Sequence, residues 1–306
     1  MTARAEAAPR LRATRVRYGE LLIKGLLGFC ALISVATTIG IVMALFLPAI
    51  EFFQEVSFVD FITGTEWAPL FEPGLFGVMP LIVGTLSVTF WAVVVAIPFG
   101  LGSAIYLSEY ASTRMRKILK PMLEVLAGIP TIVYGYFALT FFTPLLRDIG
   151  IEVDIFNALS AGLVMGVMII PTVASLSEDA MAAVPRDLRD GAFALGSSRM
   201  QVATRIVVPA AVSGIVAAFV LGVSRAVGET MIALVAGGLQ PNLSFDPRQA
   251  IETMAAFIAA TGAGDVPTGS NEYKTIFAVG ATLFVMTFIL NVVSIRLVRR
   301  FREVYE

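Results

Sequence analysis

Long apolar runs separated by short polar segments occupy most of this chain. Six runs contain few or no charged residues, and each reaches the roughly 20 residues that a helix needs to cross a bilayer. They lie at Leu21–Leu47, Met79–Leu107, Ile118–Leu146, Ala158–Leu176, Ile206–Ala236 and Thr275–Val298. The pattern predicts an all-α polytopic membrane protein with six transmembrane helices.

Lysine and arginine residues gather on one side of the predicted membrane. Eighteen of the 22 lie near the termini, between the second and third runs, or between the fourth and fifth runs. Three lie in the opposite connections, and Arg225 lies inside the fifth run. Because cytoplasmic loops carry the excess of positive charge, both termini and the segment 177–205 are predicted to be cytoplasmic.

These assignments divide the chain into consecutive parts. Residues 1–20 form a cytoplasmic tail, 21–47 a first transmembrane helix and 48–78 a periplasmic loop. A core of five transmembrane helices follows at 79–298, which includes the cytoplasmic segment 177–205, and 299–306 form a second cytoplasmic tail. The first run is too long for the core of a cleaved signal peptide, so we expect it to remain as a span.

Composition narrows the possible functions. Hydrophobic residues make up 57% of the chain and charged residues 15%, which is typical of a membrane-embedded protein. The formal net charge of −1, without a basic face interleaved with aromatic residues, argues against nucleic-acid binding. The sequence has no histidine and no cluster with metal-ligand spacing, so we expect no metal site. Its single cysteine, Cys30, excludes an internal disulfide.

Motifs for nucleotide chemistry and covalent catalysis are absent from the sequence. It contains neither a Gly-x-x-x-x-Gly-Lys-Ser/Thr phosphate loop nor a Gly-x-Ser-x-Gly nucleophile elbow. We therefore expect no catalytic residues and no cofactor in this chain. Energy for transport would come from another subunit or from an ion gradient, so a secondary transporter is one alternative, although no inverted repeat is evident. A membrane-embedded enzyme is a third class, for which no catalytic constellation is found.

A polar interruption between the fourth and fifth runs has a defined pattern. It reads Asp190-Gly191-Ala192-Phe193-Ala194-Leu195-Gly196, and nine residues later comes Ile206-Val207-Val208-Pro209. A helix of about nine residues that ends at a glycine, with a proline at the next membrane entry, is expected to lie along the membrane face. The spacing resembles the signature loop of ABC importer permeases, with Gly191 and Val208 where alanine and leucine are usual.

In that family the loop docks on a separate ATPase. In this chain Leu188, Ala192 and Leu195 would share one helical face, and Phe193 would project from a neighbouring face as an aromatic anchor. The alternative is an ordinary loop helix that lies on lipid headgroups. The candidate residues for coupling to an ATPase are Asp190, Gly191, Ala192, Phe193, Leu195 and Gly196.

The second candidate site lies in the fifth run, where Arg225 and Glu229 are charged residues at membrane depth. Their spacing would place both on one face of a helix. In one interpretation they form a buried ion pair that neutralises itself. In the other, Arg225 binds a passing oxyanion, and Glu229 accepts the proton that phosphate carries and sulfate lacks. The candidate residues of this substrate pathway are Arg225, Glu229, Thr230 and Ser224.

Longer stretches resemble the C-type permease subunit of phosphate ABC transporters. They include EVLAGIPTIVYG at 124–135, PTVASLSEDA at 171–180 and SRAVGETM at 224–231. The resemblance covers nearly everything from about residue 66 onward. The segments EYKTIF at 272–277 and RRFREVY at 299–305 also resemble this subunit rather than its A-type sister.

The resemblance implies a type I ABC importer permease fold and ATP-driven import of phosphate across the bacterial cytoplasmic membrane. The implied partners are a homologous A-type permease subunit, two copies of a cytoplasmic ATP-binding subunit that hold ATP and Mg, and a periplasmic phosphate-binding protein. The implied phosphate contact falls on Arg225, with Glu229 beside it. The nearest alternative is an ABC permease for another tetrahedral oxyanion, such as sulfate or molybdate.

Overall fold

A computed structural model describes residues 18–300, except for the side chains of Leu297, Arg299 and Arg300. The chain forms two structural units that divide after Leu47. The predicted tails 1–17 and 301–306 lie outside the described residues. Each unit is considered by itself below.

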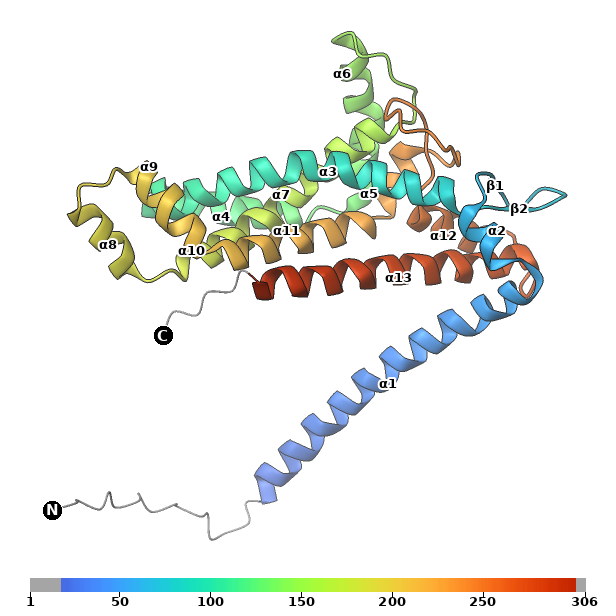
Figure 1. Ribbon diagram of the computed structural model, residues 1–306, viewed down its shortest axis with the longest axis horizontal. Coiled ribbons are helices and arrows are strands. Elements are labelled where there is room, and N and C mark those ends of the chain that lie inside the picture. The colour runs from blue at the N-terminus through green and yellow to red at the C-terminus, as the bar shows by residue number, and fades with distance from the viewer. Residues whose placement is uncertain (1–17, 301–306) are drawn as a thin grey trace. The chain divides into compact units, whose positions relative to one another are not determined.

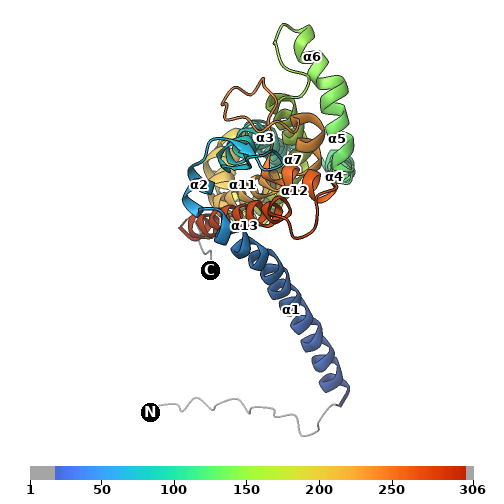
Figure 2. The ribbon, with the colours of Figure 1, turned by 90° about the vertical axis from the view of Figure 1, so that its right-hand side faces the viewer.

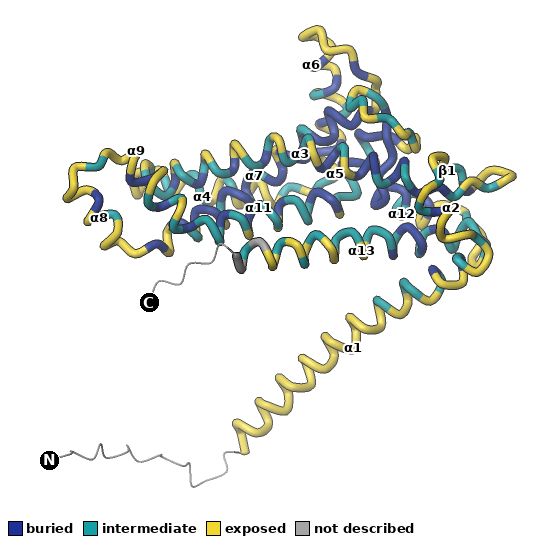
Figure 3. The backbone as a smooth tube through the Cα atoms, viewed as in Figure 1, coloured by how far each residue is buried: buried dark blue, intermediate teal, exposed yellow. Residues whose placement is uncertain are grey.

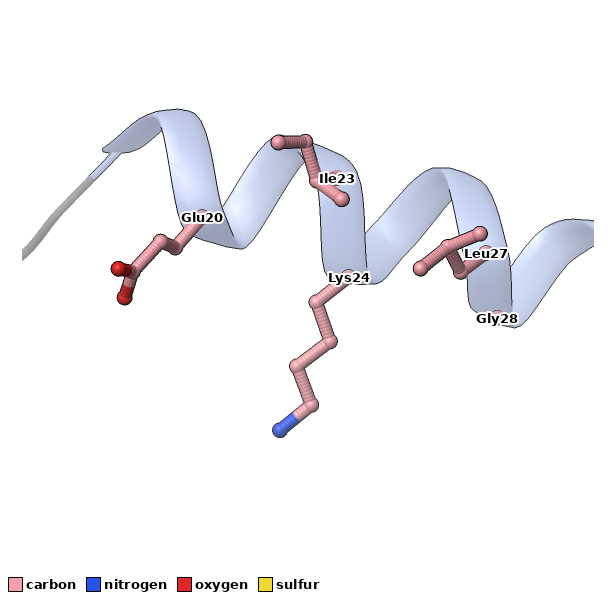
Figure 4. Close-up of a pocket in the computed structure, with 5 residues that line it drawn as sticks. All are labelled: Glu20, Ile23, Lys24, Leu27 and Gly28. Carbon is pink, nitrogen blue, oxygen red and sulfur yellow. The ribbon is translucent and has the colours of Figure 1, made fainter.

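The first unit consists, in its described part, of the N-terminal portion of helix α1 (Tyr18–Glu55). Every residue from Tyr18 to Gly40 is exposed, although most of these side chains are apolar (Figure 3). Figure 4 shows Glu20 and Lys24 projecting from the same side of this helix, beside Ile23 and Leu27. An apolar surface that no part of its own unit covers suits contact with lipid.

Long helices packed along one another form the second unit (Figures 1 and 2). They are α3 (Met79–Ile105), α7 (Ala158–Ala182), α11 (Val212–Val227) and α13 (Asn271–Arg300). Helix α7 packs against α3, α4 and α11, and α11 also contacts α3 and α13. Helix α7 contributes more residues to the largest buried cluster than any other helix, and Met165, Met168 and Ile169 are among them.

Two glycines of α7 bring it close to α3. A Cβ atom on Gly162 would lie 2.6 Å from Trp91 Cβ, and one on Gly166 would lie 2.6 Å from Val95 Cβ. Because only glycine leaves room at these distances, the two backbones can approach closely. The Gly162-x-x-x-Gly166 spacing therefore has a packing role in this structure.

We expect Gly166→Leu to destabilise the protein by at least about 1–3 kcal/mol, because the new side chain must push α3 and α7 apart. The measurement is the midpoint of thermal unfolding in detergent. Gly102→Leu is the matched control, because a Cβ at Gly102 of α3 meets nothing within 4 Å. Equal midpoints for the two variants would contradict the packing role.

The structure confirms six apolar segments, with two of them bent. Within residues 18–300, four helices are long and apolar enough to cross a membrane: α1, α3 with its π-helical extension η1 (Tyr106–Tyr110), α7 and α13. Two bent pairs raise the number to six if each pair counts as one span. The continuous runs predicted for the third and fifth spans are therefore wrong in detail.

The third run is broken at residues 128–130. Helix α4 (Thr113–Ala127) meets the segment formed by α5 (Thr131–Phe137), η2 (Ala138–Phe142) and α6 (Thr143–Asp148) at 87°. Gly128 ends α4, and Pro130 precedes α5. A proline disfavours helical geometry in the residue before it and lacks the N–H that would continue the ladder, so the helix stops here.

The fifth run is broken twice. Helices α9 (Arg199–Val202) and α10 (Val208–Ala210), with η3 (Ala203–Val207) between them, meet α11 at 73°. Helix α11 then ends at Val227, and a short π-helical segment η4 (Ala233–Gly237) follows after a break. The sequence Gly228-Glu229-Thr230 lies at this second break.

Short elements occupy the two ends of the second unit (Figure 1). One end, the α8 end, holds α8 (Arg186–Ala194) and α9. The other, the α12 end, holds α2 (Phe58–Thr63), α12 (Met254–Gly262) and the antiparallel strands β1 (Trp67–Ala68) and β2 (Leu75–Phe76). An aromatic cluster that includes Phe52, Phe61 and Trp67 packs this end.

Candidate functional site

Arg225 lies in the last turn of α11 and is half-buried. Its Nη1 donates a hydrogen bond to the hydroxyl of Thr172 on α7, at 3.0 Å. Among residues 18–300, no carboxylate lies within ion-pair distance of its guanidinium. A guanidinium has five N–H donors, so most of this group's hydrogen-bonding capacity is left for a ligand.

Glu229 does not share a helical face with Arg225, and the predicted placement is therefore wrong. Helix α11 ends at Val227, and Glu229 lies beyond its C-cap residue, Gly228. The Oε1 atom of Glu229 accepts hydrogen bonds from the backbone N–H groups of Met231 at 3.1 Å and Ile232 at 3.4 Å. The carboxylate thus caps the next helical turn, where negative charge is favoured by the free N–H groups.

Arg225 and Glu229 also do not form the buried ion pair of the first interpretation, because each has other partners. Arg225 pairs with a neutral hydroxyl, whereas Glu229 pairs with backbone amides. The two other candidates flank them: Ser224 has a buried hydroxyl without a hydrogen-bond partner in the described structure, and the Thr230 hydroxyl makes a long contact of 3.4 Å with the Gly228 carbonyl. A positive group and two weakly engaged hydroxyls therefore occur within seven residues of sequence.

A polar row on α7 leads from this region toward the α8 end. Thr172, Ser175 and Glu178 line a cavity of about 170 Å³ together with Lys120 and Glu124 of α4. Lys120 donates to Glu178 Oε2 at 2.8 Å and to Asp179 Oδ1 at 3.0 Å. These contacts hold α4 against α7, and sequence reasoning missed them because the partners lie almost 60 residues apart.

The predicted short helix is present as α8, which has nine residues. Gly196 follows it with φ of +82°, the left-handed geometry that ends a helix at glycine. Only Ala192 of the candidates is buried, whereas Asp190, Gly191, Phe193, Leu195 and Gly196 are exposed. The Leu195 side chain is 89% exposed, so the apolar face predicted for Leu188, Ala192 and Leu195 is covered at Ala192 alone.

An ion pair that the sequence did not reveal fastens α8 to the long helices. Arg189 Nη2 lies 3.1 Å from Glu109 Oε1 of η1, and the two side chains are 15% and 9% exposed. Arg189 also donates to the carbonyl of Val184 at 2.6 Å and to that of Met181, on α7, at 2.7 Å. In the sequence Arg189 counted only as one of many basic residues, and its partner lies 80 positions away.

Gly196→Leu is expected to reduce solute transport at least about tenfold, because a left-handed geometry costs a residue with a Cβ about 1–2 kcal/mol and α8 would end differently. A Cβ at Gly196 meets nothing within 4 Å, so the change acts through the backbone. Transport is measured as solute uptake in cells, with membrane insertion checked by immunoblot.

Gly150→Leu is the control for that substitution. Gly150 has φ of +89° and open space around it, so the same backbone strain is placed in the turn after α6. Uptake that falls equally in both variants would show that α8 has no special part in transport.

The described residues contain no group of three or more histidine, cysteine, aspartate or glutamate side chains that could hold a metal ion. The site offers a guanidinium that has no carboxylate partner among residues 18–300, and an exposed helix at one end. This combination defines a membrane protein with a candidate anion contact and a candidate docking element for a second protein.

Comparisons with known proteins place the chain in a family. Residues 96–303 match the family of binding-protein-dependent transport system inner membrane components. The chain is 35% identical over 265 residues to the Bacillus subtilis protein named "Probable ABC transporter permease protein YqgH", covering 85% of this chain and 84% of that one. The chain therefore belongs to the family of binding-protein-dependent transport system inner membrane components.

Further relatives and solved structures agree with this assignment. Phosphate transport system permease protein PstC 1 of Mycobacterium tuberculosis is 33% identical over 277 residues, covering 79% of this chain and 82% of that one. A bacterial alginate ABC transporter, solved in complex with an alginate-bound periplasmic protein, aligns with a TM-score of 0.64 at 16% identity, over 93% of this chain and 97% of that chain. At this identity the likeness establishes the permease fold.

Proposed function

We propose that this chain is a membrane-spanning permease subunit of an ATP-driven importer of inorganic phosphate. The observation that carries the substrate class is Arg225, a guanidinium in the last turn of α11 whose described partner is the Thr172 hydroxyl. A charge kept within membrane helices without a counter-charge is costly unless a ligand or a cavity receives it. The relatives named as phosphate transport permeases support phosphate as that ligand.

The proposed orientation places the α8 end in the cytoplasm and the α12 end in the periplasm of a bacterial cytoplasmic membrane. Basic residues of α4, α8 and α9 gather at the α8 end, as cytoplasmic segments require. The proposed partners are a homologous A-type permease subunit, two cytoplasmic ATP-binding subunits, one of which docks at α8, and a periplasmic phosphate-binding protein. ATP and Mg would be held by the ATP-binding subunits, and this chain would itself be non-catalytic.

Arg225 alone would serve any oxyanion, so the choice of phosphate needs a second group. Glu229 uses Oε1 to cap a helical turn, and the structure gives Oε2 no hydrogen-bond partner among the described residues. A carboxylate oxygen accepts a hydrogen bond from protonated phosphate and repels fully ionised sulfate. We therefore propose that Glu229 contributes to selection against sulfate and molybdate.

The test is purification of the tagged chain with the products of neighbouring genes, followed by reconstitution in lipid vesicles. We expect an ATPase and a second permease to co-purify, and ATP-dependent uptake of radioactive phosphate to require the loaded binding protein. An excess of sulfate or molybdate should leave that uptake unchanged. Uptake driven by an ion gradient without ATP, or competition by sulfate, would overturn the proposal.

A further inference from the structure

A cavity of about 730 Å³ lies at the α12 end, and neither Arg225 nor any residue of α8 lines it. Its walls come from the β1–β2 hairpin, the segment after η4, helix α12 and the start of α13. Four carboxyl groups line it, those of Glu72, Glu252, Asp265 and Glu272. No lysine or arginine of the described part of the chain lines it. An acidic cavity repels a free anion, so it is unsuited to phosphate itself.

Glu252 is the distinctive member of this group because it is 6% exposed. Within residues 18–300, its carboxyl group has no hydrogen-bond or ion-pair partner. Burial alone raises the pKa of Glu252 to about 7. The neighbouring backbone is fixed, since Met254 donates its N–H to the buried Thr85 hydroxyl of α3 at 3.0 Å. A buried carboxyl held in place without a partner destabilises the protein unless a ligand completes it.

Two basic residues that are close in sequence to cavity-lining residues are already paired. Lys274 lies 3.3 Å from Glu55 and 3.8 Å from Glu51. Arg248 lies 2.7 Å from Asp246 and holds the pKa of that carboxyl down at about 2. Neither of these two residues supplies a positive group to Glu252.

Two further features describe the group that would fit. Trp67 and Phe257, whose ring centroids are 4.9 Å apart, form an aromatic wall that attracts cations. The described residues contain no carboxylate cluster that could share a metal ion, which favours a larger ligand with a single basic tip.

The rim of the cavity is apolar and exposed. Leu70, Phe71 and Leu239 line it and are 58%, 74% and 47% exposed. Large apolar side chains gathered around a polar pocket on a loop surface are typical of a protein-binding site. The chemistry of the cavity is thus complementary to a basic residue flanked by apolar ones.

We propose that this cavity receives a lysine or arginine side chain of the soluble substrate-binding protein, with Glu252 as its counter-charge. This proposal rests on the proposed function, because it assumes that such a protein docks at the α12 end. The apolar rim would contact residues on either side of the basic one. Docking would then offset the free-energy cost of burying the Glu252 carboxyl without a partner. The complex would be stabilised relative to the undocked chain.

The test uses the complete transporter in lipid nanodiscs and the phosphate-loaded binding protein encoded with it, with affinity measured by biolayer interferometry at pH 8. We expect Glu252→Gln to weaken binding at least about tenfold, because a desolvated counter-charge is lost. Glu66→Gln removes an exposed carboxyl outside the cavity and should weaken binding less than about twofold.

Thermal unfolding separates this role from a folding defect. Between the ordinary pKa of 4.5 and about 7, folded Glu252 keeps a proton that the unfolded chain has lost. Stability is therefore lost as pH rises through this range. The carboxylates of Glu72, Asp265 and Glu272 line the same cavity, and their repulsion of ionised Glu252 adds to this loss. We expect Glu252→Gln to be more stable than the wild type at pH 8 while it binds the partner more weakly.

The outcomes are distinct. Wild-type affinity in Glu252→Gln would overturn the docking point and leave the proposed function standing. Failure of the wild-type transporter to bind the loaded binding protein at all would overturn both proposals. Weaker binding together with higher stability supports the docking point.

Discussion

Arg225→Lys is expected to lower phosphate uptake at least about tenfold while the amount of inserted protein stays the same, and Arg225→Ala at least about a hundredfold. Lysine keeps the charge but presents a point cation, whereas guanidinium binds two phosphate oxygens in a planar fork. The structure leaves this fork available because its described partner is the Thr172 hydroxyl. Initial rates of radioactive phosphate uptake in cells that lack other phosphate transporters measure the effect.

Two further variants make this prediction specific. Arg296→Lys changes an exposed arginine on α13 and should leave uptake unchanged. Thr172→Val removes the hydroxyl that positions Arg225 but not the cation, so we expect a loss of only about threefold, corresponding to one hydrogen bond. Equal uptake by the wild type and Arg225→Lys would show that the guanidinium does not contact the substrate.

The sequence predicted those features that depend on local pattern. Apolar runs located the long helices, and glycine followed by proline located α8 and its end at Gly196. Each of these signals lies within one stretch of chain, where periodicity and a few special residues are sufficient.

The bends and the partners of the charged residues were not predictable in the same way. Hydropathy averaged over a membrane-length window does not detect the breaks at residues 128–130 and 228–230, because a short break barely changes the average. The four-residue spacing placed Arg225 and Glu229 on one helix, but the helix ends at Val227. Glu109 and Arg189 are 80 positions apart, and a single sequence carries no signal of such a distant pairing.

Helix α7 connects the two candidate sites, because each of them makes a hydrogen bond to it. Thr172 of α7 accepts the hydrogen bond from Arg225, and the Met181 carbonyl of the same helix accepts one from Arg189 of α8. We expect a displacement of α8 to be passed to α7, and from α7 to the group that we propose binds phosphate. A continuous chain of contacts such as this one can carry coupling between two sites. Variants of Arg189, which joins α8 to α7, can test it.

Arg189→Met is expected to abolish phosphate uptake and the stimulation of ATPase activity by loaded binding protein. The variant leaves Glu109 buried without its cation, which costs about 3–5 kcal/mol, and removes two hydrogen bonds to backbone carbonyls. Arg186→Met changes an exposed arginine of the same helix and should retain stimulation. The measurements are ATPase rates and uptake in reconstituted vesicles.

The double variant Glu109→Met with Arg189→Met separates coupling from stability. Replacing both members of a buried ion pair with apolar side chains is often neutral for stability, so this protein should unfold close to the wild-type temperature. It still lacks the hydrogen bonds from Arg189 to Val184 and Met181, so α8 remains unfastened. We therefore expect a stable transporter that keeps its basal ATPase activity. Its phosphate uptake should be at least about tenfold below that of the wild type, which corresponds to a loss of about 1.4 kcal/mol of coupling free energy. Normal uptake by the double variant would mean that the motion of α8 reaches the spans by another route.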